Sequence, residues 1–138
     1  ADHEAAAKAI YDFTGKRILL AEDNALNAEI AVELLTSAGA VVNCAADGAQ
    51  SVARFSQSSE GYYDLILMDI QMPVMDGYTA CRRIRGLERS DAAAVPILAM
   101  TADAFSEDIL RAQEAGMNGH LAKPLDMSTL FREISKVW

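Results

Sequence analysis

The chain has 138 residues, of which 51% are hydrophobic and 23% charged, with a formal net charge of −8. This length and composition predict one globular domain with a single core, and the negative charge argues against a nucleic-acid-binding surface. No apolar run approaches the length of a membrane span and no secretory signal is visible, so we expect a cytoplasmic protein without direct membrane contact. Cys44 and Cys81 fit no metal or disulfide spacing and are expected to be reduced.

Residues 1–16 differ from the rest of the chain. They include several helix-favouring alanines but no long apolar stripe, so we expect a linker or an N-terminal arm. The chain does not begin with methionine, so excision from a longer protein is one expectation that the sequence leaves open. Residues 17–138 are expected to form the domain.

Strand-like apolar runs alternate five times with helical patterns along this domain. The expected strands are residues 17–21, 41–45, 64–68, 95–100 and 119–122. Helix starts are indicated by capping residues at Asn24 or Asn27, Asp47, Asp76, Asp103 or Ser106, and Asp126 or Ser128. This alternation predicts an α/β fold in which helices cover both faces of a five-stranded parallel sheet, a flavodoxin-like (βα)5 doubly wound sandwich.

The apolar residues at helical spacing indicate which side of each helix packs on the sheet. In the first helix they are Ile30, Ala31, Leu34, Leu35 and Ala38, and in the fourth they are Ile109, Leu110 and Ala112. Gly39 and Gly116 are expected to end these two helices.

Reactive side chains follow four of the expected strands. They are Glu22 and Asp23 after the first strand, Asp69 after the third, Thr101 after the fourth and Lys123 after the fifth. Because ligands gather at the carboxyl ends of strands in open α/β sheets, we expect these side chains to converge on one site. Asp69 follows the central, most apolar run and is the expected nucleophile.

Three carboxylates brought together would repel one another without a cation. Mg²⁺ (or Mn²⁺) would relieve the repulsion, with Asp23 and Asp69 as direct ligands and Glu22 acting through water. A carboxylate can attack phosphorus to form an acyl phosphate. The Lys123 ammonium would then pair with a phosphoryl oxygen, and Thr101 would donate a hydrogen bond to another. Taken singly, these residues are typical of turns, caps and solvated surfaces; their joint placement favours a phosphoryl-transfer site.

Four segments carry a resemblance to a known family: residues 18–24, 68–77, 99–102 and 122–125. The chain resembles a response-regulator receiver domain, and most closely the receiver domains of hybrid sensor histidine kinases, over residues 17–137. The resemblance implies a phosphorelay signalling domain that catalyses only its own phosphorylation and dephosphorylation. Its expected partners are a histidine kinase, a histidine phosphotransfer domain, or both, and it could form the cytoplasmic part of a membrane-bound sensor kinase.

The resemblance also assigns roles to individual residues. It implies phosphorylation of Asp69 and Mg²⁺ bound by Asp23, Asp69 and the backbone carbonyl of Gln71. It implies that Thr101 and Lys123 contact the phosphoryl group, and that the bond between Lys123 and Pro124 is cis.

Three further positions concern the lifetime and the readout of the phosphoryl group. Gln71 and Asp103 lie two residues beyond Asp69 and Thr101, where the resemblance implies tuning of dephosphorylation. Residue 120 is the switch position, usually Tyr or Phe in the family, whereas this chain has His120. Because imidazole is smaller than phenol and can carry charge, we predict that the phosphorylated conformation responds to pH.

Three alternative functions are weaker. An aspartate-nucleophile phosphatase commonly uses a second Asp two residues after the first as a general acid, and Gln71 occupies that position. A flavin-binding module would need a phosphate-binding loop after the first strand, where this chain has the acidic Glu22 and Asp23. A non-phosphorylated docking module would not need the intact acidic group and Lys123.

Overall fold

The computed structural model describes residues 11–102 and 106–138. The five strands are β1 (Arg17–Ala21), β2 (Val41–Ala45), β3 (Leu65–Asp69), β4 (Ile97–Thr101) and β5 (Gly119–Ala122). The α-helices are α2 (Ala25–Ser37), α3 (Gly48–Gln57), α4 (Gly77–Arg85), α5 (Ser106–Ala115) and α6 (Met127–Val137). A short 3₁₀ helix, η1 (Ser90–Ala92), precedes β4.

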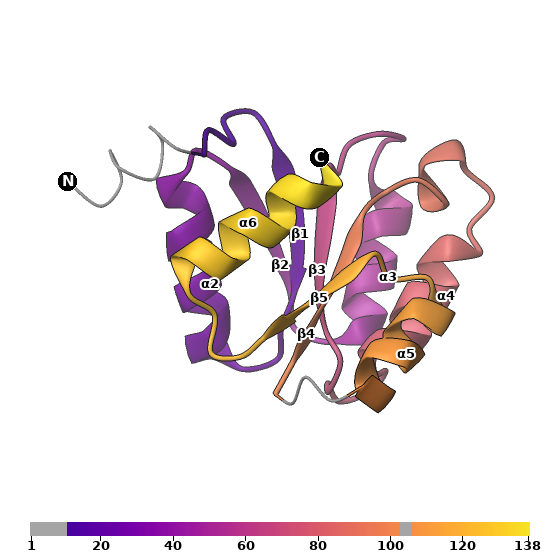
Figure 1. Ribbon diagram of the computed structural model, residues 1–138. Helices are drawn as coiled ribbons and strands as arrows, with labels where there is room; N and C mark the ends of the chain where they lie inside the picture. The colour runs from indigo at the N-terminus through magenta and orange to yellow at the C-terminus, as the bar shows by residue number, and fades with distance from the viewer. Residues whose placement is uncertain (1–10, 103–105) are drawn as a thin grey trace.

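The strands form one parallel sheet in the order β2-β1-β3-β4-β5. Figure 1 shows α2 and α6 on one face of the sheet and α3, α4 and α5 on the other. The predicted doubly wound α/β fold is therefore confirmed. Because β1, β3 and β4 are neighbours, the chain segments that leave their carboxyl ends lie at one edge of the sheet.

Each face of the sheet has its own core layer because neighbouring residues of a strand point to opposite faces. In β1, Leu19 and Ala21 pack toward α3, α4 and α5, whereas Ile18 and Leu20 pack toward α2 and α6. The central strands β1, β3 and β4 are buried and contain almost only apolar residues, as expected for a parallel sheet covered on both faces. The sheet is thus a rigid support for the polar groups at its edge.

The structure places two strands slightly later than the sequence pattern predicted. β3 extends to Asp69, which pairs with Met100, while the Asp64 carboxylate accepts a 2.8 Å hydrogen bond from the backbone N–H of Arg17. β4 begins after Pro96, which has no backbone N–H to donate, and extends to Thr101. Asp69 and Thr101 are therefore the last residues of their strands and are held in the sheet.

The helix ends follow the predicted capping pattern, with two choices now resolved. Asn24 rather than Asn27 caps α2, and Asp126 rather than Ser128 caps α6; each side chain accepts a hydrogen bond from the N–H three residues later. Gly39 and Gly116 follow α2 and α5 with φ of 98° and 101°, conformations that favour glycine. The candidate cap Asp103 lies outside the described residues.

Two apolar residues that fall at helical spacing do not enter the core. Ile30 is 40% exposed and Leu110 is 56% exposed. In α5, the predicted Ala112 and also Ala115 are buried, so small residues form much of the side of this helix that packs on the sheet. Ala112 was predicted to face the sheet and Ile109 is half-buried, so on α5 the pattern was wrong only for Leu110 and could not rank an alanine above a leucine.

Residues 11–16, assigned by the sequence to the N-terminal arm, pack on α6. Phe13 is 5% exposed, and its ring lies 5.3 Å from that of Phe131 and 4.9 Å from that of Trp138. The Trp138 indole N–H donates a 2.9 Å hydrogen bond to the carbonyl of Asp64. The domain boundary at residue 17 stays a prediction. The core includes Phe13, which precedes the motifs that carried the resemblance, and Phe131, which follows them.

No helix within residues 11–102 and 106–138 is long and apolar enough to cross a membrane.

Candidate functional site

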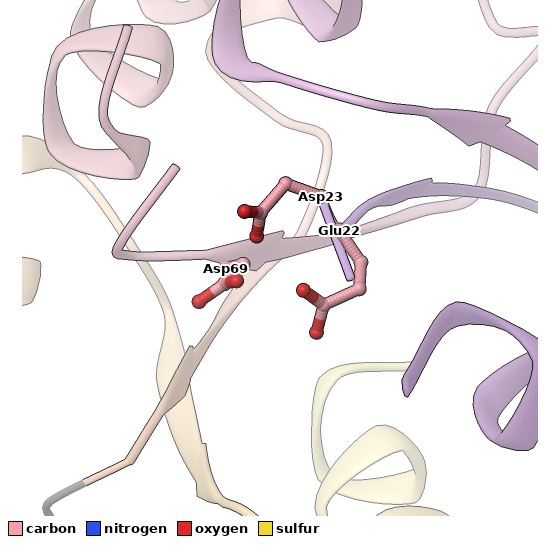
Figure 2. A group of neighbouring side chains, drawn as sticks. All are labelled: Glu22, Asp23 and Asp69. Carbon is pink, nitrogen blue, oxygen red and sulfur yellow. The ribbon is translucent and has the colours of Figure 1, made fainter. Parts of the chain in front are cut away.

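Three carboxylates lie together at the carboxyl edge of the sheet. Glu22 and Asp23 follow β1, Asp69 ends β3, and one oxygen from each lies within 4.8 Å of the others. Figure 2 shows the Glu22 and Asp23 side chains on different sides of Asp69. Glu22 and Asp69 are only 6% and 4% exposed, whereas Asp23 is exposed. Two buried acids and one accessible acid form a donor set that suits a hard divalent cation.

Lys123 joins the two buried carboxylates. Its Nζ lies 2.8 Å from Glu22 Oε1 and 3.0 Å from Asp69 Oδ2. Its backbone N–H donates to the carbonyl of Thr101, and the bond to Pro124 is cis, the geometry implied by the resemblance. The ammonium therefore supplies one positive charge to a cluster of three negative charges.

The remaining charge imbalance changes the proton affinity of the buried acids. Burial, followed by the hydrogen bond with Glu22, raises the pKa of Asp69 to about 7. Burial alone would raise the pKa of Glu22, but hydrogen bonds with Asp69, Lys123 and the N–H of Asn24 outweigh it and lower this pKa. Ionisation of Asp69 beside Glu22 is therefore unfavourable without a cation, and Asp69 keeps its proton to higher pH than an exposed aspartic acid does. A divalent cation would displace this proton.

The loop that follows Asp69 is packed tightly. Val74, 83% exposed, has a φ of 68°, which is strained for a β-branched residue, and the N–H of Met75 bonds the carbonyl of Pro73 across it. Two glycines confine this loop: a Cβ at Gly48 would lie 2.2 Å from the carbonyl oxygen of Met75, and one at Gly77 would lie 2.2 Å from that of Asp69. The position of Asp69 therefore depends on the backbone of α4.

The carboxylates and Lys123 line a cavity of about 230 Å³, which we call the central cavity. Thr101 and Gln71, both predicted as site residues, line it too, and the Gln71 N–H donates a 3.3 Å hydrogen bond to Asp69 Oδ1. Asp103 lies outside the described residues.

His120 is not among the residues that line the central cavity. It pairs with Ala99 in the sheet, is half-buried, and lines a separate space of about 30 Å³ between β5 and α5. Any influence of His120 on the phosphoryl site would therefore act through β4 and α5.

Sequence reasoning missed three polar residues of the central cavity as site residues. Asn24 and Asn27 were considered only as helix caps, and Asp108 lies in the first turn of α5, seven residues after the end of β4. The two asparagines could have been found from their place beside Glu22 and Asp23. Asp108 lines the cavity together with Ile70 and Gln71, which follow β3, and the sequence does not show that these segments meet.

A doubly wound parallel sheet with buried acids, a lysine and a hydroxyl at its carboxyl edge defines a class of proteins suited to phosphoryl transfer onto an aspartate. The sequence matches the response regulator receiver domain family over residues 18–135. The chain belongs to this family.

Relatives in other organisms are large histidine kinases. The peroxide stress-activated histidine kinase mak1 of Schizosaccharomyces pombe is 39% identical over 125 residues, which cover 90% of this chain and 8% of the kinase. Hybrid signal transduction histidine kinase L of Dictyostelium discoideum is 37% identical over 121 residues, covering 87% of this chain and 7% of the kinase. The chain thus spans less than a tenth of the length of these two relatives.

Solved structures share both the fold and the family. The receiver domain of sensor histidine kinase PA1611 from Pseudomonas aeruginosa, which holds a magnesium ion in its active-site cleft, is 41% identical with a TM-score of 0.79. The match covers 89% of this chain and 97% of that one. Chemotaxis protein CheY4 of Vibrio cholerae is 28% identical with a TM-score of 0.81, over 89% of this chain and 98% of that one.

Proposed function

We propose that this chain accepts a phosphoryl group on Asp69 from a phosphohistidine donor and thereby relays or switches a signal. The observation that carries the proposal is the placement of Asp69, which is buried at the end of β3 between an ammonium and two further carboxylates. In the transfer, the P–N bond of the donor breaks, a bond forms between an Asp69 oxygen and phosphorus, and imidazole leaves. The domain catalyses only this transfer and the later hydrolysis of its own acyl phosphate.

Each neighbouring residue has a defined task in this proposal. Asp23, Asp69 and the Gln71 carbonyl would hold Mg²⁺ (or Mn²⁺), with Glu22 acting through water, and the ion would neutralise phosphoryl charge. Lys123, already 3.0 Å from Asp69, would turn its ammonium to a phosphoryl oxygen. Thr101 would donate a hydrogen bond to another phosphoryl oxygen.

The proposed partners follow from the family and its relatives. We infer a histidine kinase, a histidine phosphotransfer domain, or both as the source of the phosphoryl group, because the relatives are histidine kinases. The net charge of −8 supports a protein partner rather than nucleic acid. We place this exchange in the cytoplasm. Gln71 and Asp103 as residues that tune phosphoryl lifetime, and His120 as a pH-sensitive switch, remain predictions.

The metal part of the proposal predicts a thermal shift. Because an ion that binds only the native state stabilises it, Mg²⁺ at ten times its Kd should add about 1.4 kcal/mol to the free energy of unfolding. Asp23→Asn should lose most of the resulting rise in Tm, measured by thermal denaturation with and without Mg²⁺. Glu114→Gln, an exposed change on α5, is the control. An unchanged Mg²⁺ response in Asp23→Asn would exclude Asp23 as a ligand.

Phosphotransfer tests the function itself. Histidine-phosphorylated phosphotransfer proteins should lose their label to the native chain in the presence of Mg²⁺, and they should keep it in the presence of Asp69→Asn. Transfer to the variant at the native rate would contradict the proposal. Rapid turnover of simple phosphoesters by the native chain would instead indicate a phosphatase.

A further inference from the structure

A groove of about 470 Å³ extends outward from the central cavity, between the first turns of α4 and α5. Both spaces share the lining residues Asp23, Ile70, Gln71 and Asp108. The outer part of the groove is lined by Asp76 and Tyr78 from the start of α4 and by Arg111 from α5. We call this space the α4–α5 groove. Thr101 and Lys123, which are predicted to contact the phosphoryl group, do not line the groove.

We propose that the α4–α5 groove receives the leaving group of the phosphodonor and favours a protonated nitrogen over a carboxylate as that leaving group. The inference rests on the proposed function, because it concerns the group that leaves phosphorus when Asp69 attacks. It assigns donor selectivity to residues that do not touch the phosphoryl group.

The geometry follows from in-line displacement. The attacking Asp69 oxygen and the leaving atom lie on opposite sides of phosphorus. Asp69, Thr101 and Lys123 line the central cavity but not the groove. A phosphoryl group bound among them therefore directs its leaving group away from the Asp69 carboxylate, and the groove, which Asp69 does not line, continues from the cavity at Gln71 and Asp108.

The outer part of the groove has fixed polar groups. The Arg111 guanidinium lies 4.4 Å from the centre of the Tyr78 ring, and Tyr78, only 4% exposed, donates its hydroxyl to the carbonyl of Asp108 at 3.4 Å. The Asp76 carboxylate is held by the N–H and hydroxyl of Thr79. These contacts hold the Arg111 guanidinium and the Asp76 carboxylate in place before a donor binds, and they fix the backbone that carries Asp108.

These charges favour a donor whose leaving nitrogen is protonated. When Asp23 is occupied by the metal, the groove retains two carboxylates, Asp76 and Asp108, against one guanidinium, Arg111. Phosphoramidate presents a protonated nitrogen and releases ammonia as its P–N bond breaks. Acetyl phosphate breaks its P–O bond and releases acetate, which develops negative charge in the groove. The net negative charge should therefore stabilise the first reaction more than the second.

The test compares the initial rates at which phosphoramidate and acetyl phosphate label the protein with Mg²⁺, measured by intact-protein mass. Arg111→Gln should raise the phosphoramidate-to-acetyl phosphate rate ratio by about two- to fivefold, and Asp108→Asn should lower it by a similar factor. Both shifts should shrink in 0.5 M KCl, because salt screens exposed charges. Arg132→Gln and Glu88→Gln repeat the same charge changes at exposed positions outside the groove.

Opposite shifts in the two groove variants, absent in the controls, are the result expected. Shifts in the same direction, or ratios equal to those of the controls, would overturn the inference while Asp69 is still labelled. Labelling by neither donor, or labelling that persists in Asp69→Asn, would instead overturn the proposed function.

Discussion

Replacement of Gly77 by alanine is expected to destabilise the fold by at least about 3 kcal/mol and to disturb the phosphoacceptor at the same time. The added methyl group would lie 2.2 Å from the Asp69 carbonyl oxygen and 2.9 Å from the Ile70 Cα, and both are backbone atoms that cannot rotate away. Relief requires α4 to move from β3, which breaks the 2.9 Å hydrogen bond from the Gly77 N–H to the Ile70 carbonyl. Urea denaturation monitored by circular dichroism measures the loss.

Gly86→Ala is the matched control, because it makes the same change just beyond the other end of α4. A Cβ at Gly86 would lie 3.4 Å from the Arg82 carbonyl oxygen, an ordinary contact, and φ is −84°. We expect a change below about 1 kcal/mol there. Equal stabilities for the two variants would show that α4 yields easily and that Gly77 does not position Asp69.

Asp69→Asn is expected to stabilise the Mg²⁺-free protein at pH 8 by about 2–4 kcal/mol. Burial and the Glu22 carboxylate raise the pKa of Asp69 from 3.8 to about 7, so ionising this residue in the folded protein is unfavourable. The folded state then keeps a proton at pH values where the unfolded chain has released its own. The Asp69 contribution to the free energy of unfolding therefore falls as pH rises from about 4 to 7.

The stability difference between Asp69→Asn and the native protein shows this effect in isolation, because other titrating groups are common to both. It should be small below pH 4, grow up to about pH 7 and then remain constant, as measured by urea denaturation in EDTA. Excess Mg²⁺ should reduce the difference, because the ion replaces the proton in the native protein only. Glu114→Gln, an exposed change on α5, is the control variant. A difference that does not depend on pH would mean that the proton is not held on Asp69.

The sequence pattern predicted the sheet and the edge at which the site forms because both depend on local signals. An apolar run such as residues 65–68 leaves few alternatives to a buried strand, and in a parallel sheet the residues that follow such runs meet. The exact strand ends needed partners from elsewhere. Asp69 belongs to β3 because Met100 pairs with it, and this pairing exists only in the assembled sheet.

Contacts over long sequence distances could not be predicted in this way. The Arg85 guanidinium donates to the carbonyls of Ala92, Val95 and Gly116, joining α4 to the loops before β4 and after α5. Arg89 similarly donates to the carbonyls of Phe55 and Ser58 at the end of α3. In the sequence, each is one more basic residue near a helix end, and no spacing rule relates it to carbonyls so far along the chain.

The same limit applied to the charge balance within the site. Lys123 was predicted to meet a phosphoryl group, and the structure adds that it pairs first with Glu22 and Asp69. Glu22 was predicted to act on the metal through water. Its burial and its bond to Lys123 show that it also holds the lysine in place. Burial decides these roles, and burial depends on how α2 and the loop after β5 pack together.

The most direct test of the account is the mass of the intact protein after treatment with acetyl phosphate and Mg²⁺. We predict that the native chain gains one phosphoryl group, that peptide mapping places it on Asp69, and that EDTA prevents its addition. Asp69→Asn should gain no phosphoryl group. Asp64→Asn makes the same chemical change at the residue just before β3 and should gain one. Full labelling of Asp69→Asn, or a native chain that stays unlabelled although its fold is intact, would contradict the assignment of Asp69 as the phosphoacceptor.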